Sequence, residues 1–144
     1  MPAIFFFEEG ITYKLKHKTA VRQWVTETIQ AEGYKLKELN YIFCPDSYLL
    51  QINQQYLNHD TYTDIITFDN SETERVITGD IFISIHRVRE NALKFNISGT
   101  DELHRVIIHG ALHLLGYKDK TPAAKLKMTE KEDFYLNLRG FKKS

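Results

Sequence analysis

The stretch "IITFDNSETERVITGDIFISI", Ile65 to Ile85, decides the fold class of this chain. Its two ends, "IITF" and "RVITGDIFISI", are rich in β-branched and aromatic residues, and the acidic segment "DNSETE" joins them. Residues of these types are enriched in strands, and two such runs around a polar connection are typical of a hairpin. The stretch therefore predicts two strands that pair with each other.

The N-terminal part of the chain supplies two further candidate strands. The segment "AIFFFEE", residues 3–9, is short and β-rich, and "ELNYIFC", residues 38–44, alternates apolar side chains until Pro45 ends it. The alternating positions of the second segment are Leu39, Tyr41 or Ile42, and Phe43. With the hairpin, these segments predict a sheet of about four strands.

About five helices are predicted around these strands. Two signals predict them: apolar residues at helical spacing, and residues that favour helix ends. The predicted helices span residues 19–33, 46–56, 86–95, 101–115 and 121–140. The candidate N-caps are Thr19, Asp46, Ser98 or Thr100, and Thr121, with Pro122 in the last helix's first turn, and the candidate stops are Gly33, Gly116 and Gly140. Strand and helix segments are mixed and do not strictly alternate. We therefore expect one small α/β (α+β) domain, residues 1–144, whose helices cover a mixed sheet.

Composition limits the function classes without choosing one. The 19 basic and 19 acidic residues cancel, so net charge argues neither for nor against nucleic acid, although residues 104–144 hold nine Lys/Arg against four Asp/Glu. The one cysteine, Cys44, excludes an intrachain disulfide and fits a reducing compartment. The apolar run "AIFFF" is too short for a signal peptide or a membrane span. These features predict a cytoplasmic protein with no membrane partner.

The segment "HGALHLLGYKD", His109 to Asp119, is the candidate site. Residues four apart on a helix share a face, so His109 and His113 can bind one ion, as in the H-E-x-x-H zinc motif. Gly116 can turn the chain sharply, which lets Asp119 return as a third ligand. Two imidazoles and one carboxylate leave coordination positions open for water, which is typical of a catalytic metal site. We expect one divalent ion there, with zinc as the first choice.

Two other interpretations of these residues compete with this one. In the first, the histidines are ordinary helix residues and Asp119 is a surface residue between Lys118 and Lys120. The glycine at the turn and the carboxylate within reach favour the metal. In the second, the site is a zinc peptidase, which needs a glutamate as general base directly after the first histidine. Gly110 stands in that position, so peptide hydrolysis is disfavoured.

At these residues the chain resembles a known family. "HGALHLLGYKD" is similar to the signature H-G-x-L-H-L-x-G-Y-D-H of the YbeY family of bacterial endoribonucleases. "TDIITF", residues 63–68, resembles the family's T-D-V-L-S-F, and "GDIFIS", residues 79–84, resembles its G-D-I-x-I-S. The three blocks agree in order and spacing, and the resemblance covers roughly residues 50–128. The first signature is highly specific, and the other two support it.

The resemblance implies a single-domain, metal-dependent endoribonuclease that usually holds zinc. Such proteins act in the cytoplasm on ribosomal RNA precursor, notably at the 3′ end of the small-subunit RNA, and in ribosome quality control with ribosomal subunit components as partners. By position, the resemblance makes His109 and His113 ligands and puts Asp119 in place of the third histidine. Lys118 stands where the family has an aspartate.

Two departures from the family pattern affect the chemistry. The carboxylate of Asp119 is a harder, charged ligand, which makes the metal a weaker Lewis acid and admits metals other than zinc. The family's arginine, seven residues before the aspartate of T-D-V-L-S-F, corresponds to Leu57. Another cation must then act on the phosphate, and the candidates are Lys118, Arg87, Arg89 and His59.

The remaining polar residues of the three blocks have structural interpretations. We expect Thr63, Asp64 and Asp80 to cap turns through bonds to the backbone. Tyr117 is expected to pack against the turn, and His86 and His104 to lie on helix surfaces.

The leading hypothesis is cleavage of single-stranded RNA, whose phosphates and bases are accessible in loops and ends. The metal would lower the pKa of its bound water to about 7, making that water the nucleophile. Basic residues of "HRVRENALK" and near the C-terminal helix would hold the RNA backbone.

One alternative is a ribosome-assembly binding protein with a non-catalytic metal, which the loss of arginine at Leu57 favours. The other is a metallohydrolase acting on a substrate other than RNA, with Gly110 against a peptide.

Overall fold

The computed structural model describes residues 3–56 and 63–141. Within these residues the chain forms four strands: β1 (Ile4–Glu8), β2 (Lys35–Cys44), β3 (Ile65–Asp69) and β4 (Val76–Ser84). Its helices are α1 (Lys18–Ala31), α2 (Asp46–Tyr56), α3 (Ile85–Phe95), α4 (Gly99–Leu114) and α5 (Pro122–Asn137). The predicted mixed sheet of about four strands and the five helices are confirmed.

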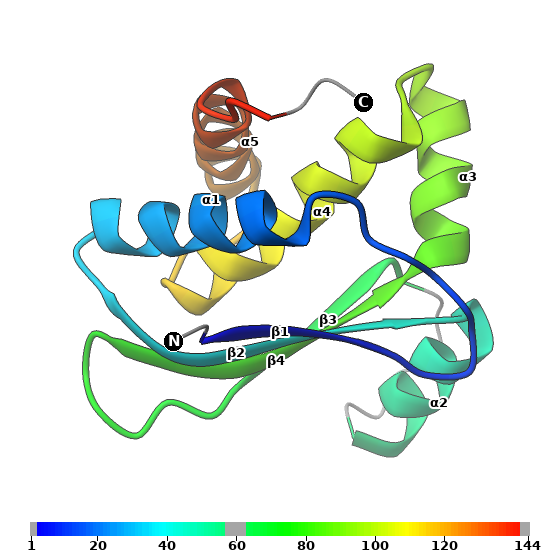
Figure 1. Ribbon diagram of the computed structural model, residues 1–144, viewed down its shortest axis with the longest axis horizontal. Helices are drawn as coiled ribbons and strands as arrows, with labels where there is room; N and C mark the ends of the chain where they lie inside the picture. Colours follow the sequence, from blue (N-terminus) through cyan, green and yellow to red (C-terminus); the bar gives the residue numbers. More distant parts are fainter. Residues whose placement is uncertain (1–2, 57–62, 142–144) are drawn as a thin grey trace.

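The strands form one sheet in the order β1-β2-β4-β3. β1 pairs parallel with β2 and β2 parallel with β4, whereas β3 pairs antiparallel with β4, as predicted from their hairpin sequence. Helices α1, α4 and α5 lie on one side of the sheet and α2 on the other (Figure 1). The larger hydrophobic core therefore lies between the sheet and α1, α4 and α5, and a smaller cluster lies beneath α2.

The buried face of β2 anchors α4 to the sheet. Leu39, Tyr41 and Phe43 are the residues on this face, and each is at most 1% exposed. Ile42 lies on the opposite face, because side chains alternate along a strand. The Tyr41 hydroxyl donates a hydrogen bond of 2.9 Å to the Ile107 carbonyl oxygen of α4. This bond satisfies a buried hydroxyl and helps to set the position of the helix above the strands.

Gly110 lies where α4 packs closely against the sheet. A Cβ atom at this position would lie 2.9 Å from Cδ1 of Ile65 and 3.0 Å from side-chain atoms of Ile81. Such distances are shorter than almost all real Cβ contacts, so a larger residue would require the side chains of Ile65 and Ile81 to shift. The same contact explains why a peptidase glutamate is absent here: a glutamate at this position would point into the core.

The predicted helix ends are confirmed at some positions and wrong at others. Ser98 caps α4 by accepting a hydrogen bond from the Asp101 N–H, and Thr121 caps α5 with Pro122 as its first residue. Thr100 lies inside α4 and does not cap it. The prediction of Thr19 as a cap is also wrong, because α1 begins at Lys18. His17 occupies the N-cap position with φ 59° and makes no side-chain cap bond.

His104 is buried, which corrects the prediction that it lies on a helix surface. It is 2% exposed, and its ring lies 5.7 Å from the ring of Trp24 on α1 and 5.5 Å from the ring of Phe141. The Arg139 guanidinium donates to its Nδ1 at 2.7 Å. His86, by contrast, is exposed as predicted. The side of α4 that carries His104 is covered by segments distant in sequence.

Stability should fall in mild acid because of His104. Burial, followed by the charge of Arg139, lowers the pKa of His104 to about 4. The unfolded chain takes up this proton near its ordinary pKa of about 6.5, so the His104 contribution is present above that pH. It is lost as pH falls from about 6.5 to about 4.

We expect His104→Gln to remove this part of the pH dependence. Between pH 7.5 and pH 5, the free energy of unfolding of the variant should change by about 2 kcal/mol less than that of the wild type. Urea denaturation at the two pH values measures this difference. The exposed His86→Gln is the control and should keep the wild-type slope. An identical slope in all three proteins would contradict the lowered pKa.

Among the described residues, none of the helices combines the length and the apolar character needed to cross a bilayer.

Candidate metal centre

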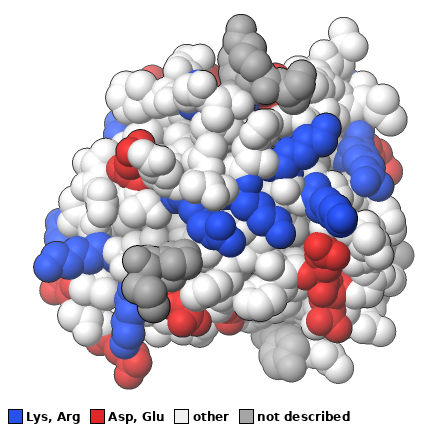
Figure 2. Space-filling model, viewed as in Figure 1, with Lys and Arg blue, Asp and Glu red and all other residues white. Residues whose placement is uncertain are grey.

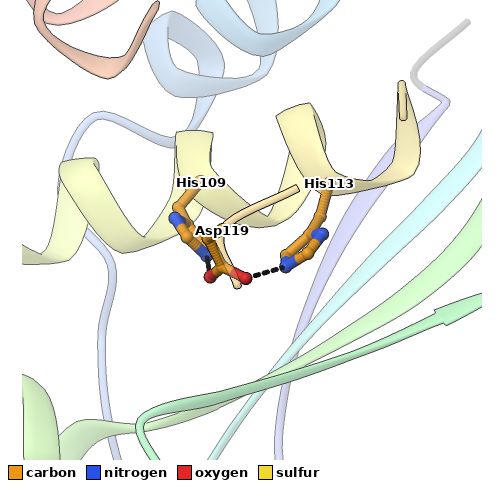
Figure 3. Close-up of side chains that lie close together, drawn as sticks. All are labelled: His109, His113 and Asp119. Carbon is orange, nitrogen blue, oxygen red and sulfur yellow. Dashed lines mark ion pairs between the residues drawn. The ribbon is translucent and has the colours of Figure 1, made fainter. Parts of the chain in front are cut away.

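Three predicted ligand residues converge at the C-terminal part of α4 (Figure 3). His109 and His113 lie one turn apart on this helix. The helix ends at Leu115, and Gly116 takes φ 103°, a left-handed conformation that favours glycine. The chain turns at this residue and brings Asp119 opposite the two imidazoles. Gly116 therefore has the role that the sequence predicted for it.

The distances among these side chains match a single bound ion. His109 Nε2 lies 3.3 Å from Asp119 Oδ2, and His113 Nε2 lies 3.5 Å from Asp119 Oδ1. One possible ligand atom from each residue can be chosen so that all three lie within 4.8 Å of one another. Ligand atoms about 2.1 Å from one tetrahedral zinc ion lie about 3.4 Å apart. The three residues therefore fit a divalent ion, and three protein ligands leave at least one position open.

Glu132 of α5 lies directly behind His109. The Nδ1–H of His109 donates to Glu132 Oε2 at 2.6 Å, which leaves Nε2 facing Asp119. A carboxylate behind a histidine fixes the ring orientation and its tautomer, and such partners are typical of metal-binding histidines. The sequence pattern did not predict Glu132 as part of the site. A signal for it existed, because Glu132 shares the buried side of α5 with Met128 and Tyr135 at helical spacing.

Arg105 is a second residue of the site that was not predicted from the sequence. Its guanidinium donates to Glu132 Oε1 and to Asp133 Oδ1, each at 2.7 Å. Arg105 lies one turn before His109 on α4, so it shares the face that carries the candidate ligands. Arg105, Glu132 and His109 form one continuous chain of hydrogen bonds from α4 to α5 and back.

A cavity of about 640 Å³ opens beside these residues. It lies between β3 with its preceding residues, α4 and α5. Its charged lining is predominantly acidic: Asp64, Glu102, Asp119 and Glu132 face Arg105 and Lys120. A divalent cation would offset this excess of negative charge. Such compensation is needed before a phosphate group, itself negative, can enter.

Protonation in the cavity follows from burial and from these neighbours. Burial lowers the pKa of His109, but the hydrogen bond and charge of Glu132, with the other nearby carboxylates, outweigh burial and raise it. Burial, and then the charge of Asp64, raises the pKa of Glu102 to about 7. Burial also raises the pKa of Asp64. For His113, burial and then the charge of His109 lower the pKa. Protons therefore compete with a metal for His109 more than for His113.

The residues predicted as structural support occupy different kinds of places. The Thr63 hydroxyl donates to the Ile65 carbonyl oxygen at 3.3 Å, a side-chain bond to the backbone at the start of β3. Asp64 lines the cavity. Asp80 does not cap a turn, because it lies within β4. Its two carboxylate oxygens accept hydrogen bonds from the side-chain amides of Asn40 and Asn70.

The predicted cations do not line this cavity within the described residues. Arg87 pairs with Asp46 of α2, and Arg89 lies over the ring of Tyr13 at 5.9 Å. Lys118 is exposed, and its neighbour Lys120 lines the cavity in its place. The prediction of His59, like the departure at Leu57, lies outside the described residues. The described cations of the cavity are therefore Arg105 and Lys120, neither of which the sequence analysis proposed.

A second carboxylate, Glu32 at the end of α1, contacts both the turn after α4 and helix α5. The Tyr117 hydroxyl donates to Glu32 Oε1 at 2.7 Å, and Lys131 Nζ lies 3.0 Å from Oε2. The hydroxyl of Tyr135 also donates to Oε2. Tyr117 lies two residues before Asp119, and Lys131 lies directly before Glu132. Glu32 therefore fixes the turn after α4 and α5 relative to each other, and Tyr117 does more than pack against the turn.

We expect Glu132→Gln to weaken metal binding without unfolding the protein. The amide keeps the size of the side chain but loses the charge that orients His109 and pairs with Arg105. Loss of such a partner typically lowers metal affinity about 10- to 100-fold. Competition with a chromophoric chelator measures this affinity. Glu130→Gln, an exposed change on the same helix, is the control, and equal affinity of the two variants would show that Glu132 does not support the site.

The donor set, the open coordination position and the adjacent cavity define the class: a candidate metal-dependent hydrolase. Comparison with known proteins identifies the family within that class. The family profile described as Endoribonuclease YbeY matches residues 7–140. The chain belongs to the YbeY family of endoribonucleases.

Individual relatives agree over nearly the whole chain. Endoribonuclease YbeY of Cytophaga hutchinsonii is 55% identical over 138 residues, which cover 96% of both chains. Endoribonuclease YbeY of Flavobacterium psychrophilum is 52% identical and covers 92% of this chain and 94% of its own. The solution structure of TM1509 from Thermotoga maritima superposes with a TM-score of 0.65 at 29% identity, covering 93% of this chain and 87% of that one. The resemblance noted in the three sequence blocks is thus confirmed.

Proposed function

We propose that this chain is a metal-dependent endoribonuclease that cuts single-stranded RNA during ribosomal RNA maturation. The proposal extends to the 3′ end of small-subunit precursor RNA, to ribosome quality control, and to ribosomal subunit components as partners in the cytoplasm. It assigns the whole of residues 1–144 to a single catalytic domain. The family assignment supports the reaction class, and the cellular roles rest on the family resemblance.

One observation carries the proposal. Two imidazoles and one carboxylate, at ligand spacing, border an acidic cavity in which Glu132 orients His109. We assign His109, His113 and Asp119 as ligands of one divalent ion, with zinc as the expected metal. The ion would act as a Lewis acid toward a phosphate oxygen and would lower the pKa of bound water.

The chain's own residues would perform the remaining tasks. Glu132 holds His109 in the tautomer whose Nε2 faces the cavity. Lys120 lines the cavity and can neutralise a phosphate that lies beside the ion. Glu102, whose pKa is raised to about 7, is suited to exchange a proton at neutral pH. The carboxylates repel RNA when the ion is absent, so the ion would serve substrate binding as well as the reaction.

A cleavage assay tests this function. Metal-loaded protein is expected to cut a single-stranded segment of ribosomal RNA precursor, and a chelator is expected to stop the reaction. Re-addition of zinc should restore it. Protein with its metal intact that leaves the precursor uncut would refute the proposal.

The pairing of Arg105 favours a second candidate, a ribosome-assembly protein with a non-catalytic metal. Of the two cations that line the cavity in the described part of the chain, Arg105 is paired with two carboxylates. If metal-free and metal-loaded proteins bind ribosomal subunits equally and neither cuts RNA, this candidate replaces the first.

A further inference from the structure

A second cavity, of about 310 Å³, lies on the other side of α4 from the metal centre. Three parts of the chain form it: the segment before α1, helix α3, and the first turns of α4. The polar part of its lining includes Lys14, Lys16, His17, Arg89, Gly99 and Thr100. We call this cavity the basic cleft.

The charge of the basic cleft is opposite to that of the metal cavity. Lys14, Lys16, His17 and Arg89 are exposed at its rim, and no acidic residue is among the described residues that line it. Figure 2 shows basic side chains gathered across the middle of this face of the molecule. The cleft is therefore a local positive site on a chain whose net charge is zero.

The floor and walls of the cleft are well packed. Leu15, Ile85, Val88 and Leu103 are each at most 8% exposed, so the cleft rests on the hydrophobic core. The guanidinium of Arg89 lies over the ring of Tyr13, 5.9 Å from its centroid, which limits the freedom of the arginine. The basic residues at the rim therefore lie above well-packed apolar side chains.

The first turn of α4 adds backbone donors to this wall. Gly99 and Thr100 are the first two residues of the helix, so their N–H groups have no acceptor within it. The positive end of the helix dipole lies at the same place. A Cβ atom added to Gly99 would meet nothing within 4 Å, so this turn is open to a ligand. Backbone N–H groups beside lysine and arginine are a combination that suits phosphate oxygens.

We infer that the basic cleft binds a backbone phosphate of the RNA strand at a point separate from the cleavage site. The identity of the strand rests on the proposed function. Helix α4 contributes to both places, and Thr100 lies about 14 Å along the helix axis from His109 at about 1.5 Å per residue. The helix therefore sets a fixed separation between the two sites. An RNA that reaches both should bind more tightly than an RNA that reaches one.

The test is a charge reversal with a matched control. Lys14→Glu with Lys16→Glu alters the rim, and Lys35→Glu with Lys37→Glu makes the same change, at the same spacing, on exposed residues of β2. Binding of the metal-loaded proteins to fluorescein-labelled single-stranded RNA with 2′-O-methyl sugars is followed by anisotropy over a range of salt concentrations. Metal content and melting temperature are measured for each variant.

We expect the Lys14/Lys16 variant to bind this RNA about tenfold more weakly while it keeps its metal. The slope of log affinity against log salt should shrink by about 0.7, because the loss of one phosphate contact on a single strand removes about 0.7. The Lys35/Lys37 variant should behave as the wild type. Equal weakening in both variants would overturn the inference, since general charge would then explain the result.

Two further outcomes separate the ligands and the proposals. If inorganic phosphate binds the wild type but not the Lys14/Lys16 variant, and RNA affinity is unchanged, the cleft takes free phosphate and the RNA assignment is overturned. If the wild type binds RNA through the cleft but cuts none, the proposed function fails and the inference about the cleft stands.

Discussion

His109→Ala combined with His113→Ala is expected to abolish metal binding and RNA cleavage together. Four-ligand zinc sites release about 10–16 kcal/mol on binding, or roughly 3 kcal/mol per ligand. Removing two ligands should therefore weaken zinc binding by roughly four orders of magnitude. Asp119 alone cannot hold an ion against solvent at that affinity.

Elemental analysis of purified protein, beside cleavage of the precursor RNA, measures both losses. The two imidazole side chains are 19% and 31% exposed, so their removal should leave the core intact. Thermal melting of the metal-free proteins checks this expectation. His86→Ala, an exposed histidine on α3, controls for nonspecific binding to histidine. Full metal content in the double variant would remove both residues from the site.

The fold was predictable where local sequence decides structure. The hairpin of β3 and β4 follows from two β-rich runs around an acidic connection, and the antiparallel pairing agrees. The cap Thr121 acts within one helical turn, so its sequence context was sufficient, whereas the sequence offered both Ser98 and Thr100 and the structure selects Ser98. Alternation along the strand did not decide whether Tyr41 or Ile42 faces the core. Burial of Tyr41 depends on α4, whose Ile107 accepts its hydrogen bond.

The wrong predictions involve contacts between distant segments. His104 resembles any polar residue of a helix in the sequence, and it is packed against Trp24 of α1, Phe141 near the C-terminus and Arg139. The predicted cap Thr19 is a favourable residue for that role, yet α1 starts before it at Lys18. For His104, tertiary packing overrides the local pattern.

The candidate site divides in the same way. His109, His113 and Asp119 lie within one helix and the turn after it, so their spacing alone brought them together. Glu132 is 23 residues from His109 and Glu32 is 85 residues from Tyr117. These supporting carboxylates depend on how α1 and α5 pack against α4. A sequence pattern finds ligands more readily than the residues that orient them.

A substitution series at Asp119 is the second large effect that we expect. If Asp119 is a ligand, Asp119→Ala leaves two histidines and should weaken zinc binding about 100-fold, at roughly 3 kcal/mol per ligand. Asp119→His should retain zinc, because imidazole is also a zinc ligand, and should shift the preference toward softer ions. Asp119→Asn keeps the shape but loses the charge, so its affinity should lie between those of the wild type and Asp119→Ala.

The opposing interpretation predicts a much smaller change in zinc affinity. If Asp119 only pairs with a neighbouring lysine at the surface, its contribution is about 0–1 kcal/mol, and the three variants should bind zinc almost equally. Lys118→Ala is the control, since it removes an adjacent exposed charge and no candidate ligand. Zinc and cobalt affinities across the series, by chelator competition, separate the two interpretations. Unchanged affinity in Asp119→Ala would exclude Asp119. The ion would then be held by the two histidines and a carboxylate from elsewhere in the cavity, of which Asp64 is the first to test because it lines the same cavity.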